Sequence, residues 1–138
     1  MSGISDDVRD YIARVTPAAR RREATVVLGV LQRATGETAW MSSASVVGFG
    51  SYEYPYADGS IGTTAAIAFA PRRESVRVHL AESLLPYADE LSRLGEHRTT
   101  AACIHLGPID EVDLAVLEAI AARSYRRVTE AAPPERLS

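Results

Sequence analysis

The sequence predicts an α+β domain, arranged as a two-layer sandwich, from three observations. Runs with apolar residues at helical spacing stand near both ends of the chain, extended runs rich in β-branched and aromatic residues stand in its middle, and tight turns separate the extended runs. Strands joined by tight turns pair antiparallel, and the apolar face of such a sheet is covered by helices. We therefore expect a mainly antiparallel four-stranded sheet with helices on one face, in the order α-α-β-β-β-α-β-α.

Two helices are predicted ahead of the first strand. The first begins after Ser5, because a hydroxyl cap followed by two acidic residues suits the positive end of a helix. The second begins at Thr16-Pro17, where threonine would cap the free amides and proline suits the first helical position. It ends at Gly36, since glycine readily takes the left-handed conformation that closes a helix.

Three strands are predicted in the middle of the chain. Residues 45–56 form an extended run, a turn follows at 57–60, and residues 63–69 are apolar with β-branched members, so the two runs form a hairpin. Residues 76–80 alternate between apolar and polar side chains. That alternation is typical of a strand covered on one face only.

The last third of the chain predicts a short helix, a strand and a final helix. Residues 84–94 have the spacing of an amphipathic helix that stops at Gly95. Residues 101–106 form the last strand, and Asp110 caps the final helix.

One domain accounts for the chain, 1–138. Its length suits a single hydrophobic core, and no linker or internal repeat interrupts it. We expect the core to span residues 6–127 and residues 128–138, which contain two consecutive prolines, to form a frayed tail.

Composition argues against several classes of partner. The net charge of −3 makes nucleic acid an unlikely partner, because phosphate affinity comes mainly from clustered positive charge. All 15 basic residues are arginine, which excludes lysine Schiff bases and the lysine of a phosphate-binding P-loop. No apolar run is long enough for a membrane span, and the start of the chain is acidic where a secretory signal is basic. We expect a cytoplasmic protein without a membrane partner.

Four short motifs occur in order at compatible spacing, each within a predicted element or at its boundary. They are VVGFGSYEY at 46–54, APRR at 70–73, RLGEHRT at 93–99 and IDEVDL at 109–114. On these motifs the sequence resembles the YdhG-like domain family over about residues 6–127. The resemblance implies a frataxin-like overall shape. One branch of that family is linked to iron delivery for iron–sulfur cluster and haem assembly, so iron is implied by the resemblance alone.

An aromatic stripe and neighbouring basic side chains predict a ligand-binding surface. Tyr52 and Tyr54 are two residues apart in an extended run, so their rings point the same way. Aromatic rings with polar tips line ligand surfaces, and arginines recognise anionic groups. The candidate ligand-binding residues are Trp40, Tyr52, Tyr54, Arg72, Arg73 and His97. Alternatively the rings cover one sheet face with their hydroxyls in water, or they form a homodimer interface.

A metal site is a further candidate. His79, Cys103 and His105 alternate with apolar residues in their strands, so all three should lie on the sheet face opposite the helices. Two histidines and a thiolate suit zinc or ferrous iron. The alternative is that they are half-exposed strand residues without a ligand.

No catalytic motif stands out, so a non-enzymatic binding domain is the first functional hypothesis. Its partner would be a small anionic ligand or another protein. The alternatives are a frataxin-like iron chaperone, which the resemblance implies, and an enzyme that uses His79 or His97 as a general base.

Overall fold

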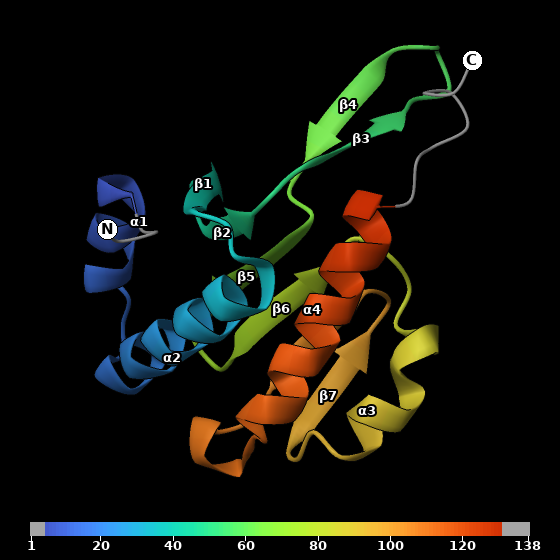
Figure 1. Cartoon of the computed structure of the whole chain (residues 1–138). Coiled ribbons are helices and arrows are strands. Elements are labelled where there is room, and N and C mark those ends of the chain that lie inside the picture. The colour runs from blue at the N-terminus through green and yellow to red at the C-terminus, as the bar shows by residue number, and fades with distance from the viewer. Residues whose placement is uncertain (1–4, 131–138) are drawn as a thin grey trace.

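A computed structural model describes residues 5–130 of the chain, apart from the side chains of Tyr54 and Pro55 (Figure 1). The helices are α1 (Asp6–Ala13), α2 (Ala18–Thr35), α3 (Ala88–Ser92) and α4 (Leu114–Glu130), with single 3-10 turns at Leu85–Tyr87 and Ile109–Glu111. The strands are β1 (Ala39–Ser43), β2 (Val46–Phe49), β3 (Tyr52–Pro55), β4 (Ile61–Thr64), β5 (Ile67–Pro71), β6 (Val76–Leu80), β7 (His97–Thr100) and β8 (Cys103–Leu106).

Six of the strands form one antiparallel sheet in the order β1-β2-β5-β6-β8-β7, and β3 and β4 form a separate two-stranded sheet. The prediction of an α+β fold with a mainly antiparallel sheet is therefore confirmed. The prediction of four strands is wrong.

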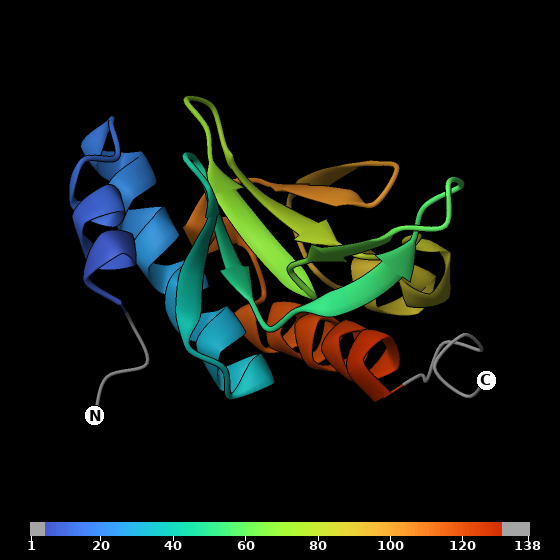
Figure 2. The same ribbon diagram turned by 90° about the horizontal axis from the view of Figure 1, so that it is seen from above.

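The predicted hairpin is present, but it is broken in its middle. Phe49 pairs with Ile67 in the large sheet, and after a short gap Tyr52 pairs with Thr64 in the small one. Gly50 stands at the break with φ of 63°, a left-handed conformation that favours glycine. Each of the two predicted strands thus becomes two, and the outer half of the hairpin projects from the body of the molecule (Figure 2).

Two edge strands were missed in the sequence. β1 pairs with β2 at one edge of the sheet, and β7 pairs with β8 at the other. In β7, His97 is half-buried and the three residues after it are exposed, so its sequence lacks the apolar alternation that marks a strand. β1 has only five residues and just one of them is buried.

The core lies between the large sheet and the pair α2 and α4, which cover one face of the sheet (Figure 2). Leu31 and Leu117 are fully buried from the helical side. Phe49 and Phe69 stack from neighbouring strands with ring centroids 6.3 Å apart. Burial of such apolar side chains is the main source of stability, and it leaves the opposite face of the sheet without a helical cover.

Two predicted helix caps are wrong, and the predicted helix at 84–94 is instead a 3-10 turn at Leu85–Tyr87 followed by the five-residue α3. Ser5 caps α1, because its hydroxyl accepts a hydrogen bond from the Val8 amide at 3.3 Å, and Gly36 closes α2 with φ of 71°. Pro17, not Thr16, occupies the cap of α2, and no side chain caps that helix.

Asp113, not Asp110, caps α4. Its carboxylate accepts from the amides of Ala115 at 3.1 Å and Val116 at 3.2 Å, while Asp110 stands in the preceding 3-10 turn. The predicted tail also begins too early, since α4 continues to Glu130. The rest of that tail, 131–138, lies outside the described residues.

Candidate functional site

The uncovered face of the six-stranded sheet, here called the open face, holds the best-defined candidate site. Along the central strands the register places His79 opposite Ala68 and Cys103. One step further along, Arg77 stands opposite Ala70 and His105. Because side chains alternate along a strand, Arg77 and His79 point to the open face, while Val76, Val78 and Leu80 point to the other face and are buried in the core.

A cavity of about 340 Å³ lies on the open face beside the broken hairpin. Its lining includes Ala68 and His79 from the central strands, Tyr52 and Thr64 from the hairpin, and Ser42 from β1. The break at the hairpin is therefore what supplies the second wall. Segments distant in sequence meet at this cavity. Three of its nine lining residues, Ser42, Tyr52 and Thr64, carry hydroxyl groups.

Near this cavity, Gly48 lies so close to its neighbours that a larger side chain would not fit there. A Cβ atom at Gly48 would lie 2.8 Å from the Ala65 Cβ and 3.4 Å from the Trp40 Cε2. Trp40 is 37% exposed, and its indole Nε1–H donates to the Gly50 carbonyl oxygen at 3.2 Å. Trp40 thus ties β1 to the hairpin break, and it does not line the cavity.

Two buried nitrogen atoms on the open face lack a hydrogen-bond partner among residues 5–130. They are the Nε atom of Arg77 and the Nε2 atom of His79. A buried polar atom without a partner costs free energy and is uncommon in native proteins. Both side chains come from β6, two residues apart, so they occupy the same face. His79 lines the cavity, while Arg77 is not among the lining residues.

The charges around the two imidazoles are cationic. Burial lowers the pKa of His79, and Arg72, Arg77 and His105 lower it further. Burial also lowers the pKa of His105, with Arg77 and Arg98 adding to the effect. Every charged group that shifts these two pKa values is positive. The open face therefore disfavours further positive charge and favours an anion.

Tyr52 is half-buried in the cavity wall. Burial raises the pKa of its phenol, and the negative charge of Glu82 raises it further, so the hydroxyl stays protonated at neutral pH. Tyr54 pairs through its backbone with Gly62. Its side chain lies outside the described part of the chain.

The remaining predicted ligand residues stand apart from the cavity lining. Arg72 is half-buried, and its Nη1 donates to the Ser45 carbonyl oxygen at 3.3 Å. Arg73 is exposed in the turn after β5, and its carbonyl oxygen accepts from Arg20. His97 places its Nδ1 2.7 Å from the Gly95 carbonyl oxygen in a different hollow near the sheet edge. Among the members of the predicted set whose side chains the structure describes, only Tyr52 lines the cavity, while the charge of Arg72 acts on His79.

The three predicted metal ligands come from the neighbouring strands β6 and β8. His79 and Cys103 face each other across β6 and β8, and the Nε2 of His105 lies 2.9 Å from the Thr100 hydroxyl. Burial raises the pKa of the Cys103 thiol although Arg77 and Arg72 oppose the effect, so the thiolate that metals prefer is disfavoured. Within residues 5–130 no group of three or more histidine, cysteine or acidic side chains is placed to hold a metal ion.

Sequence reasoning missed Ser42, Thr64 and Arg77. The alternation in 76–80 was enough to place Arg77 on the same face as His79. Nothing in the sequence indicated that Ser42 and Thr64 would join them, since that depends on β1 and on the hairpin break.

Comparisons of the chain with protein-family models, with curated proteins and with solved structures return no match. Membership of the YdhG-like family therefore stays a prediction that depends on the four motifs. The same holds for the frataxin-like shape and the iron binding that the resemblance implies. In the part of the chain that the structure describes, no helix is long and apolar enough to cross a membrane.

Proposed function

We propose that this chain is a non-enzymatic binding domain whose open face takes a small organic anion. The observation that carries the proposal is the pair of buried nitrogens, Arg77 Nε and His79 Nε2, which lack hydrogen-bond partners among the described residues. They lie on one face of β6, and His79 lines a cavity of about 340 Å³ there. An anion that accepts a hydrogen bond from Arg77 would satisfy a buried donor that is otherwise unpaired.

The size and lining of the cavity restrict the ligand. A volume of about 340 Å³ is at the lower end of the usual range for small-molecule sites. Ala65 and Ala68 offer apolar surface, while the hydroxyls of Ser42, Tyr52 and Thr64 offer hydrogen bonds. These features favour a compact molecule with an apolar body and one carboxylate or phosphate group.

A binding role also fits the surroundings of His79 better than general-base catalysis does. A catalytic histidine is commonly oriented by a carboxylate that stabilises its protonated form. Burial holds the pKa of His79 below the ordinary value, and the charged groups that act on it are cationic and lower it further. Such an imidazole is suited to contact an anion and not to retain an abstracted proton.

A thermal-shift screen of small carboxylic acids and phosphate monoesters, followed by calorimetry of the hits, tests the proposal. Arg77→Gln should weaken a hit by about tenfold or more, because a charge-assisted hydrogen bond is lost. Arg9→Gln, at an exposed residue of α1, is the matched control and should leave the dissociation constant unchanged. A screen without hits, or a hit whose affinity survives Arg77→Gln, would contradict the assignment.

A further inference from the structure

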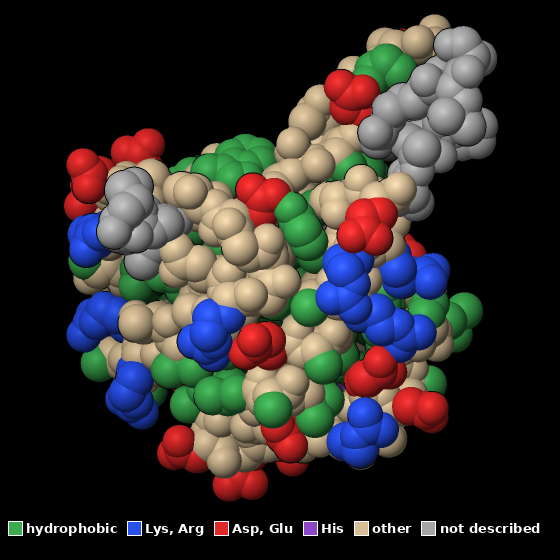
Figure 3. All heavy atoms as spheres, in the orientation of Figure 1, with side chains coloured by type: hydrophobic (Ala, Val, Ile, Leu, Met, Phe, Trp, Pro, Cys, Tyr) green, Lys and Arg blue, Asp and Glu red, His purple; other side chains and the backbone are tan. Residues whose placement is uncertain are grey.

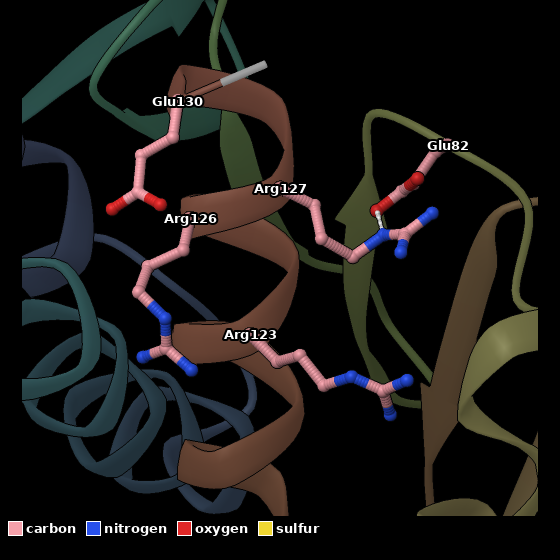
Figure 4. Close-up of a pocket in the computed structure, with 5 residues that line it drawn as sticks. All are labelled: Glu82, Arg123, Arg126, Arg127 and Glu130. Atoms are coloured by element: carbon pink, nitrogen blue, oxygen red, sulfur yellow. Dashed lines mark hydrogen bonds and ion pairs between the residues drawn. The ribbon is translucent and has the colours of Figure 1, made fainter.

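A second cationic hollow lies on the helical layer, apart from the open face. It has a volume of about 630 Å³ and is lined by Arg123, Arg126 and Arg127 of α4, with Glu82 and Glu130 (Figure 4). In the space-filling view, arginine side chains gather over the C-terminal half of α4 (Figure 3). The hollow shares no lining residue with the cavity of the open face.

Helical spacing explains how three arginines come together. Positions i+3 and i+4 lie one turn from position i, so Arg123, Arg126 and Arg127 all reach the same hollow. Arg126 approaches it from the other side of α4 than Arg123 and Arg127 (Figure 4). Like charges at this spacing repel one another and destabilise a helix by a few tenths of a kcal/mol per pair. An exposed cluster of this kind therefore has an unfavourable term that a bound anion would relieve.

Two of the three arginines are held in place by the protein. The Arg123 guanidinium lies 5.0 Å from the centroid of the Tyr87 ring, and its Nη1 is 2.5 Å from the Glu90 Oε2. The Arg127 Nε donates to the Glu82 Oε2 at 2.9 Å. Both are anchored through one nitrogen, so their other N–H groups have no hydrogen-bond partner within residues 5–130.

Three arginines and two glutamates line the hollow, and Glu90, which is outside the lining, forms an ion pair with Arg123. The Glu82 Oε2 accepts from Arg127 and also from the Tyr87 hydroxyl at 2.7 Å, so this carboxylate is already engaged. Arg126 forms no hydrogen bond or ion pair with any described residue. Its side chain extends away from Glu130, on the other side of α4 from Arg123 and Arg127 (Figure 4).

We infer that this hollow binds a small molecule with at least two phosphate groups. Arginine presents several N–H donors in a planar fork that matches phosphate oxygens, and exposed single ion pairs contribute little in salt. A ligand with one charge would therefore gain little here. A diphosphate reaches Arg126 with one group while the other contacts Arg123 and Arg127, and the volume of about 630 Å³ accommodates a nucleotide-sized molecule.

Calorimetry with inorganic pyrophosphate, at low ionic strength, tests the inference, with orthophosphate and citrate as comparison anions. Arg126→Gln is the decisive variant, because Arg126 is exposed and forms no hydrogen bond or ion pair with a described residue, so its loss should leave the thermal midpoint unchanged. The expected result is saturable binding of pyrophosphate, weaker binding of orthophosphate, and a loss of about tenfold or more in Arg126→Gln.

Two control variants separate this site from the open face. Arg9→Gln removes one exposed arginine on α1 and should leave pyrophosphate binding unchanged. Arg77→Gln should also leave it unchanged, whereas it should impair the organic-anion site. Absence of pyrophosphate binding, equal affinity in Arg126→Gln and the parent protein, or citrate binding at least as tight as pyrophosphate would each overturn the inference. Loss of pyrophosphate binding in Arg77→Gln alone would assign the phosphate to the open face instead.

Discussion

At the scale of single residues, His79 couples the open face to pH. Its pKa lies below the ordinary 6.5 in the folded protein, chiefly because burial disfavours the charged imidazolium. When pH falls below about 6.5, the unfolded chain therefore binds a proton before the folded one does, and the free energy of unfolding decreases. This contribution is present above that pH and is lost below it.

The prediction is that acid destabilises the protein less once His79 is replaced. Urea denaturation of the parent protein and of His79→Gln at about pH 7.5 and about pH 5.5 measures the effect. The parent should lose more stability between the two conditions. Equal losses would show that His79 titrates alike in the folded and unfolded states. A bound anion should act in the opposite sense, because it favours the imidazolium, so affinity should rise as pH falls.

At the scale of elements, Gly95 joins the end of α3 to the edge strand β7 and to the start of α4. Its φ is 101°, and a Cβ atom there would lie 2.2 Å from the Glu111 carbonyl oxygen. Gly59, in the turn of the β3–β4 hairpin, has a similar φ of 93° but nothing within 4 Å of its Cβ position. A side chain at Gly59 would therefore meet backbone strain alone, whereas a side chain at Gly95 would meet both backbone strain and a steric clash.

Gly95→Ala should destabilise the protein by about 3 kcal/mol or more, because the left-handed backbone and the clash both act. Gly59→Ala should cost only about 1 kcal/mol, since strain acts alone. Chemical denaturation of both variants measures the difference. Similar losses at the two positions would mean that the Glu111 carbonyl moves aside at little cost.

At the scale of the whole molecule, the broken hairpin decides whether the open face has a cavity. β2 and β5 pair up to the break, so a short turn between Gly50 and Ala66 should close the large sheet without β3 and β4. Replacement of residues 51–65 by Asn-Gly removes Tyr52 and Thr64 from the cavity and leaves the core between sheet and helices in place.

This deletion should keep the far-ultraviolet circular dichroism of an α+β domain and cooperative unfolding, while binding of the organic anion is lost. Binding of pyrophosphate on α4 should persist, which serves as the internal control. Retained binding of the organic anion would show that the hairpin is not a wall of the site, and a chain that fails to unfold cooperatively would show that the hairpin belongs to the folding core.

Local patterns were enough to predict much of the framework. The two-residue period of 76–80 marked a one-sided strand, the glycine at position 36 marked a helix end, and tight turns marked antiparallel pairing. The edge strand β7 escaped because exposed strands bury few side chains and therefore show no apolar alternation. The cap of α4 was misplaced because two aspartates precede that helix and only the backbone geometry distinguishes them.

The sequence by itself thus determined the fold class, the antiparallel pairing and the single-sided burial of the central strands, because these follow from periodicity and turn chemistry within a few residues. Only the tertiary structure decided that the open face holds a cavity, that the Arg77 Nε and His79 Nε2 atoms are buried without hydrogen-bond partners among the described residues, and that three arginines of α4 line a hollow with Glu82. These features arise where segments distant in the chain pack together, and no local pattern encodes which distant side chains become neighbours.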